Sequence, residues 1–130
     1  MSNVEPFVTR VEDVAAETWN DARGRLSFHT LISGEATPSN GLVAGVSIIE
    51  PGGALALHSH AEPEIYYVLE GAAAVSIDGV ERIVAPGAAV FIPGYARHSI
   101  RNHFDKTFKI LYVFPADRFD QIRYDFVGAA

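Results

Sequence analysis

From residue 40 onward, the chain alternates short apolar runs with breaks made of glycine, proline and aspartate. The runs are rich in Val, Ile, Phe and Tyr, and the breaks fall at Pro51-Gly52-Gly53, Gly71, Asp78-Gly79, Pro86-Gly87, Pro93-Gly94, Asp105-Lys106 and Pro115. Strand-like runs at such regular spacing are typical of an antiparallel all-β sandwich or barrel. Asp-Gly readily adopts the positive φ angles of a two-residue hairpin turn. We therefore predict an all-β fold with a hairpin at Asp78-Gly79.

The segment ahead of these runs follows a helical period from Val11 to about Arg23. Its apolar residues would form one stripe, made of Val11, Val14, Ala15 and Trp19, and Asp21-Ala22-Arg23-Gly24 would end the helix. We expect this short N-terminal helix to cover one edge or end of the sheet. At the other end of the chain, the tail FPADRFDQIRYDF at 114–126 holds aromatic residues that need somewhere to pack.

The composition fits one compact domain over residues 1–130. Of the 130 residues, 48% are hydrophobic and 20% are charged, so a single core is expected. The formal net charge is −6 and the ten Lys and Arg residues are scattered, which argues against a nucleic-acid partner and favours a small-molecule substrate. The N-terminus lacks a signal-peptide pattern, and no apolar run reaches about eighteen residues. We expect a cytoplasmic protein with no membrane span.

Candidate metal ligands gather in the stretch HSHAEPEIYYVLEG at 58–71. Because residues two apart in a strand point to the same side, His58 and His60 would project together. Glu64 begins the next strand, and His98 can supply a further nitrogen. The chain has no cysteine, so His and carboxylate are the strong ligands it offers. Three His and one Glu suit Fe, Mn, Ni, Co or Zn, and we predict one divalent transition metal at this site.

Two motifs in this region resemble those of the cupin superfamily. The first motif, which contains His-x-His and a glutamate between two glycines, is matched by Gly52, His58, His60, Glu64 and Gly71. The second motif is matched by Gly87, Pro93, His98 and Asn102. It departs from the family where Tyr95 stands in place of the usual glycine. The resemblance implies a single jelly-roll β-barrel, a metal-binding core at about residues 42–115, and assembly as a homodimer.

The chain is also similar to the small cupin lyases that cleave dimethylsulfoniopropionate. The likeness lies in Pro51-Gly52-Gly53, in Leu57 to Tyr66, and in the tail from Phe114 to Phe119 with Tyr124. In that family, a tyrosine near the metal takes the proton α to the carboxylate, and β-elimination gives acrylate and dimethyl sulfide. The resemblance implies this catalytic role for Tyr66, with Tyr124 as the second candidate.

The same ligand set is compatible with two other functions. An Fe(II) dioxygenase would use three His and one Glu and bind oxygen at a neighbouring position, and a non-catalytic sensor or storage barrel would only hold a ligand. Aromatic faces at Trp19, Phe28 or the tail would favour the sulfonium group of the lyase substrate. His29 and His103 have no partners at ligand spacing, and Glu62 is expected to be a solvated surface residue.

Overall fold

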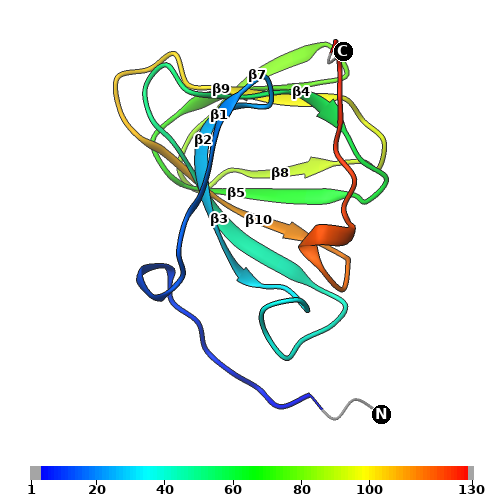
Figure 1. The fold of residues 1–130 in the computed structure, drawn as a ribbon. Coiled ribbons are helices and arrows are strands. Elements are labelled where there is room, and N and C mark those ends of the chain that lie inside the picture. Colours follow the sequence, from blue (N-terminus) through cyan, green and yellow to red (C-terminus); the bar gives the residue numbers. More distant parts are fainter. Residues whose placement is uncertain (1–3, 129–130) are drawn as a thin grey trace.

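The structure, a computed structural model, describes residues 4–128, which form a fold made almost entirely of strands (Figure 1). In chain order its elements are η1 (Val11–Asp13), β1 (Glu17–Asp21), β2 (Gly24–Ile32), β3 (Val43–Ile49), β4 (Ala54–Ser59), β5 (Glu64–Glu70), β6 (Ala73–Ile77), β7 (Val80–Val84), β8 (Ala89–Ile92), β9 (His98–Arg101), β10 (Phe108–Phe114), η2 (Phe119–Gln121) and β11 (Asp125–Phe126). The predicted all-β class is confirmed. The predicted domain of residues 1–130 extends at both ends beyond the described residues. Within residues 4–128, both 3-10 helices are only three residues long, too short to cross a membrane.

One antiparallel sheet curls to enclose the core. Its strand order is β7-β6-β9-β4-β2-β3-β10-β5-β8, with β1 added to β2 and β11 added to β4. In Figure 1 the curl places β9 and β4 across from β5, β10 and β3. The inward side chains from both sides form a single apolar cluster. This arrangement agrees with the predicted jelly-roll barrel.

The strand β5 shows how the sheet separates core from surface. Glu64, Tyr66 and Val68 are buried, whereas Ile65 and Tyr67 are exposed, as expected when successive side chains point to opposite faces of a strand. Tyr66 therefore faces inward and Tyr67 faces outward. Any reaction inside the sheet must therefore use the buried side chains of β5, and its exposed side chains form part of the molecular surface.

Asp78 and Gly79 form the predicted hairpin turn between β6 and β7. Their φ angles are 48° and 84°, in the left-handed region that glycine adopts freely and aspartate tolerates. The Oδ1 atom of Asp78 accepts a hydrogen bond of 3.0 Å from the N–H of Arg97, and the N–H of Asp78 donates to the Arg97 carbonyl at 2.8 Å. These two hydrogen bonds thus fix the turn to the backbone of Arg97, the residue just before His98.

The predicted helix from Val11 to about Arg23 is wrong beyond its first turn. After η1, the chain forms β1, which pairs with β2 so that Asp21 lies opposite Gly24. The Asp21-Ala22-Arg23-Gly24 sequence, expected to end a helix, makes the hairpin turn instead. A strand prevails because it buries Trp19 against Phe28, at 5.1 Å between ring centroids, and because it pairs the backbone groups of β2 that a helix would leave unpaired.

Candidate metal centre

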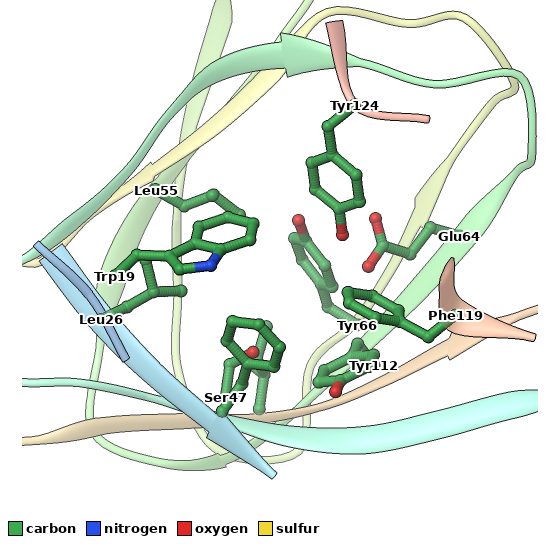
Figure 2. A pocket seen from close by; sticks show the side chains of 11 residues that line it. Trp19, Leu26, Ser47, Leu55, Glu64, Tyr66, Tyr112, Phe119 and Tyr124 are labelled. Atoms are coloured by element: carbon green, nitrogen blue, oxygen red, sulfur yellow. The ribbon is translucent and has the colours of Figure 1, made fainter. Parts of the chain in front are cut away.

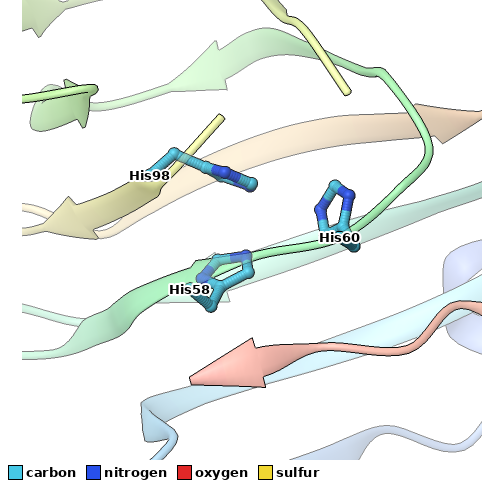
Figure 3. Close-up of side chains that lie close together, drawn as sticks. All are labelled: His58, His60 and His98. Carbon is cyan, nitrogen blue, oxygen red and sulfur yellow. The ribbon is translucent and has the colours of Figure 1, made fainter. Parts of the chain in front are cut away.

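Three histidine side chains converge inside the sheet (Figure 3). His58 lies on β4, His60 follows one residue after that strand ends, and His98 begins β9. β4 and β9 are neighbours, and His58 and His98 are direct partners in their register. All three side chains are buried, and their candidate ligand atoms lie within 4.8 Å of one another. Alternation along β4 and the pairing of β4 with β9 therefore bring the three rings together.

Each of these rings is held by a hydrogen bond at Nδ1. The Nδ1 atom of His58 lies 2.7 Å from the carbonyl oxygen of Ala56, that of His60 lies 2.8 Å from the carbonyl of Glu62, and that of His98 lies 2.9 Å from the carbonyl of Ala96. A carbonyl oxygen only accepts, so Nδ1 must carry the proton in every case. A neutral ring then keeps its lone pair on Nε2, and the backbone selects the tautomer that binds a metal.

The surroundings of the Nε2 atoms also fit a cation site. Among the described residues, the buried Nε2 atoms of His58 and His98 have no hydrogen-bond partner. The Oε1 atom of Glu64 lies 3.1 Å from Nε2 of His60 and 3.3 Å from Nε2 of His98. Buried lone pairs without a donor are costly, whereas one divalent cation would satisfy all of these atoms. The residues fit a site of the three-His, one-carboxylate kind.

The proton affinities of the rings differ because their surroundings differ. Burial, together with the neighbouring His98, lowers the pKa of His58 from 6.5 to about 3, so its Nε2 lone pair is free across the neutral range. Burial also favours the neutral form of His60. The hydrogen bond and negative charge of Glu64 outweigh that effect and raise the pKa of His60. Protons therefore compete with a metal at His60 more than at His58.

A pocket lies beside the histidines, with aromatic and aliphatic walls (Figure 2). It is lined by Trp19, Leu26, Phe28, Ser47, Leu55, Glu64, Tyr66, Ile110, Tyr112, Phe119 and Tyr124. Figure 2 shows the hydroxyls of Tyr66 and Tyr124 and the carboxylate of Glu64 directed into the same space. Burial, followed by the charge of Glu64, raises the pKa of both tyrosines well above 10. The hydroxyl of Tyr66 is buried and has no hydrogen-bond partner among the described residues, so it is available to a bound molecule.

The C-terminal tail closes one side of this pocket. Its last strand, β11, pairs with β4 so that Phe126 lies opposite His58. The ring of Tyr124 stacks on that of His58, with 4.9 Å between centroids and 15° between planes. At the start of the tail, the backbone N–H of Phe119 donates to Oγ of the buried Ser33 at 2.7 Å. The aromatic residues of the tail, whose packing the sequence left open, thus line the site.

The structure brings together the residues that the sequence singled out. His58, His60, Glu64 and His98 meet at one point, Tyr66 and Tyr124 line the adjoining pocket, and Trp19 and Phe28 form part of its wall. Their roles as ligands and catalytic groups stay predictions. His29 and His103 lie elsewhere: the Nδ1 atom of His29 bonds to the Val14 carbonyl, and the His103 ring lies on that of Phe104.

The solvent exposure of Glu62 differs from that predicted from the sequence. It was expected to be a solvated surface residue, but its side chain is half-buried, and its Oε1 atom is buried without a hydrogen-bond partner among the described residues. Its carbonyl orients His60. The spacing of the motif leaves this position variable, so no sequence signal marked it.

The departure from the second motif at Tyr95 leaves the bend intact. Tyr95 adopts φ 67° and its backbone N–H donates to the carbonyl of His60 at 2.7 Å, so tyrosine occupies a conformation that favours glycine. We expect Tyr95→Gly to raise the free energy of unfolding by about 1 kcal/mol, measured by urea denaturation, because the side chain is 76% exposed and contributes little packing.

Two further substitutions test this interpretation. Tyr95→Ala retains the Cβ atom and should bring no such gain. Gly94→Ala should cost about 2 kcal/mol, since a Cβ atom there would collide with the carbonyl oxygen of Ala61. Equal stability of the alanine and glycine variants at position 95 would show that the φ angle carries no strain.

Comparison with known proteins places these features in a family. Residues 45–114, more than half of the chain, match the family model of the cupin domain. Dimethylsulfoniopropionate lyase DddW of Ruegeria pomeroyi is 35% identical to this chain over 107 residues, which cover 82% of this chain and 70% of that protein.

Solved structures share the fold. The polyketide cyclase RemF from Streptomyces resistomycificus matches with a TM-score of 0.83 at 24% identity, over 97% of this chain and 88% of that chain. A predicted oxalate decarboxylase from Thermotoga maritima matches with a TM-score of 0.76 at 27% identity, over 85% of this chain and 99% of that chain. Proteins with such different names show that the fold by itself does not choose a reaction. On the family match and the relative together, this chain belongs to the cupin family and is similar to a dimethylsulfoniopropionate lyase.

Proposed function

We propose that this protein is a metal-dependent lyase that acts on a small monocarboxylate, with dimethylsulfoniopropionate as the best specific candidate. Its products would be acrylate and dimethyl sulfide. The observation that carries the proposal is the unpartnered hydroxyl of Tyr66, buried beside the three histidines in a pocket of aromatic walls. The 35% identity to a lyase of this name supports the same choice.

The charges around the pocket support a substrate with one carboxylate. Among the described residues that line it, Glu64 is the one charged side chain, and none is Lys or Arg. A divalent cation with three neutral imidazoles and Glu64 would carry one net positive charge, which a single carboxylate balances. A second carboxylate or a phosphate would meet apolar walls and lose its hydration without compensation.

The aromatic walls of the pocket support a substrate group that needs no hydrogen bonds. Trp19, Phe28 and Phe119 present aromatic rings there, and an aromatic face attracts a sulfonium or quaternary ammonium cation, as well as apolar groups. A primary ammonium would lose hydrogen bonds to water that these walls do not replace. The pocket therefore favours a carboxylate joined to a bulky onium group or an alkyl group.

The chain supplies the proton acceptor for elimination. We propose His58, His60, Glu64 and His98 as the residues that hold the metal, which when bound would act as a Lewis acid on the substrate carboxylate. Tyr66, as its phenolate, would take the proton from the carbon next to the carboxylate at Oη. The C–H electron pair then forms the new carbon–carbon double bond, and the C–S bond breaks with its electrons leaving on sulfur. The walls around Trp19 would exclude water during this step.

An anaerobic assay tests the proposal. The purified protein, reconstituted separately with Fe(II), Mn(II), Co(II), Ni(II) and Zn(II), is incubated without oxygen with dimethylsulfoniopropionate and with a panel of small carboxylates and catechols. We expect acrylate and dimethyl sulfide in equal amounts, and no turnover of catechols. Turnover that requires oxygen would support the dioxygenase in place of the lyase, and binding without turnover of any compound would support the sensor.

A further inference from the structure

A second hollow, which we call the outer hollow, adjoins the pocket beside the histidines, which we call the inner pocket. The two spaces share Trp19, Phe119 and Tyr124, whose side chains line both. The inner pocket has a volume of about 20 Å³, room for about one water molecule. The outer hollow has a volume of about 450 Å³ and is open to solvent. A small molecule can therefore bind in the outer hollow before the shared side chains move to admit it.

Aromatic rings form much of the wall of the outer hollow. The ring centroid of Tyr124 lies 5.9 Å from those of Trp19 and Phe126, and 6.2 Å from that of Phe119. Aromatic faces attract cations, and the chain itself gives an example, because the guanidinium carbon of Arg23 lies 4.3 Å from the centroid of Trp19. The rings of Phe119, Tyr124 and Phe126 are half-buried and have no such cation within residues 4–128. They can therefore receive one from outside.

The charged side chains around the outer hollow have a negative sum. Those that line it are Glu17, Arg23 and Asp120. Arg23 is paired with Asp21 at 2.8 Å. Asp120 is paired with Arg118 at 2.6 Å. With these partners included, two positive and three negative side chains leave a net charge of −1. The outer hollow therefore favours a cation over an anion.

The carboxylate of Glu17 carries the charge that the two arginines leave uncompensated. Its Oε2 atom accepts a hydrogen bond of 3.1 Å from Nε1 of Trp19. This donor is neutral, so it fixes the carboxylate next to the aromatic wall without cancelling its charge. A negative charge beside aromatic faces suits a sulfonium or quaternary ammonium ion, which brings a positive charge and needs no hydrogen-bond acceptor.

We propose that the outer hollow is a binding site for onium cations, with Glu17 as its charged residue and the rings of Phe119, Tyr124 and Phe126 as its walls. This site rests on the proposed function in one respect, because the onium carboxylate held there would be the molecule that the inner pocket converts. Glu17 determines specificity: it distinguishes a positively charged substrate from one that carries an alkyl group of the same shape. The apolar walls of the inner pocket accept either group.

Two probes of the same shape test the site. β-Alanine betaine carries a trimethylammonium group, and its analogue carries a tert-butyl group at the same place, so the two differ in charge at one atom. The chain has one tryptophan, and the fluorescence of Trp19 therefore reports binding of either probe to the full chain without any turnover. We expect the wild type to bind the betaine at least about fivefold more tightly, and added sodium chloride to reduce this preference.

Three substitutions separate the outer hollow from the inner pocket. Glu17→Gln keeps an oxygen that can accept from Trp19 and removes only the charge, so the preference should fall at least about threefold. Phe126→Leu removes a ring that lines the outer hollow and not the inner pocket, and it should also lower the preference. Glu81→Gln is the matched control, because it removes the same charge on β7, where Glu81 pairs with Arg101. It should leave the preference unchanged.

Equal binding of the two probes to the wild type would overturn the proposed site, as would fluorescence that neither probe changes at millimolar concentration. The site is also overturned if Glu17→Gln or Phe126→Leu keeps the wild-type preference, or if Glu81→Gln lowers it as much as Glu17→Gln does. These outcomes are independent of the lyase assay. Acrylate formation without a preference between the probes would contradict the outer site alone, and a preference without acrylate formation would contradict only the proposed reaction.

Discussion

Replacing His98 with alanine is expected to remove bound metal from the protein. His98 contributes one of three convergent Nε2 atoms, and no other described side chain near it offers a nitrogen at ligand distance. Loss of a residue that merely supports a ligand costs about 10–100-fold in metal affinity, so loss of the ligand itself should cost at least about 100-fold. Elemental analysis of the purified variant measures the ratio of metal to chain, and His58→Ala should give the same result.

Two measurements separate loss of the metal from loss of the fold. A metal that binds only the native state raises the melting temperature, so added metal should stabilise the wild type and leave His98→Ala unchanged. His103→Ala is the matched control, because this histidine is exposed and packs on Phe104 outside the site, and it should keep its metal. Stoichiometric metal in both His58→Ala and His98→Ala would rule out the assignment of ligands.

Tyr66→Phe is expected to lower turnover by about 10²–10⁴-fold while metal content stays at the wild-type level. The substitution removes one atom, Oη, which is buried without a partner. Removing an unpartnered buried hydroxyl should cost little stability or even increase it, so a large loss of kcat with an unchanged free energy of unfolding points to chemistry. Tyr67→Phe, one residue along β5 and facing outward, should retain wild-type turnover.

The pH profile gives a second measure of the same role. Burial, with the charges of Glu64 and Tyr124, raises the pKa of Tyr66, so its phenolate form is scarce at neutral pH and grows as pH rises. A bound cation would lower that pKa again. We expect kcat/KM of the wild type to increase with pH, and the residual activity of Tyr66→Phe to lose this increase. If Tyr124→Phe shows the loss and Tyr66→Phe does not, the base is Tyr124.

The site was more predictable than the segments that enclose it. His58 and His60 meet because they stand two apart at a strand end, and Glu64 follows after a short corner, so local spacing was enough. The ring of His98 joins them through the pairing of β9 with β4. Spacing within one segment does not reveal this contact, so His98 could be predicted only from the resemblance of the second motif to that of the family. The fold class could be predicted for a similar reason, because the breaks of Gly, Pro and Asp between apolar runs are local features of the sequence.

The misassigned helix shows where local patterns fail. Trp19 fits a helical stripe with Ala15 and equally fits a strand that buries every second residue, and only the presence of β2 as a pairing partner decides between them. The same holds for the tail, because the pairing of β11 with β4 joins residues that are far apart in the chain. Long-range pairing settles both cases, and a single sequence does not display it.

The two faces of β5 constrain how this sequence can change over evolution. Glu64 and Tyr66 point inward, while Ile65 and Tyr67 point outward from the next positions along the same strand. Because a shift of one residue turns every side chain of a strand to the opposite face, inserting or deleting a single residue at the start of β5 would move Tyr67 into the pocket and Tyr66 onto the surface. A change of one residue in length here should therefore not be tolerated, and homologues of this chain are expected to keep the spacing between His60 and Glu64 fixed.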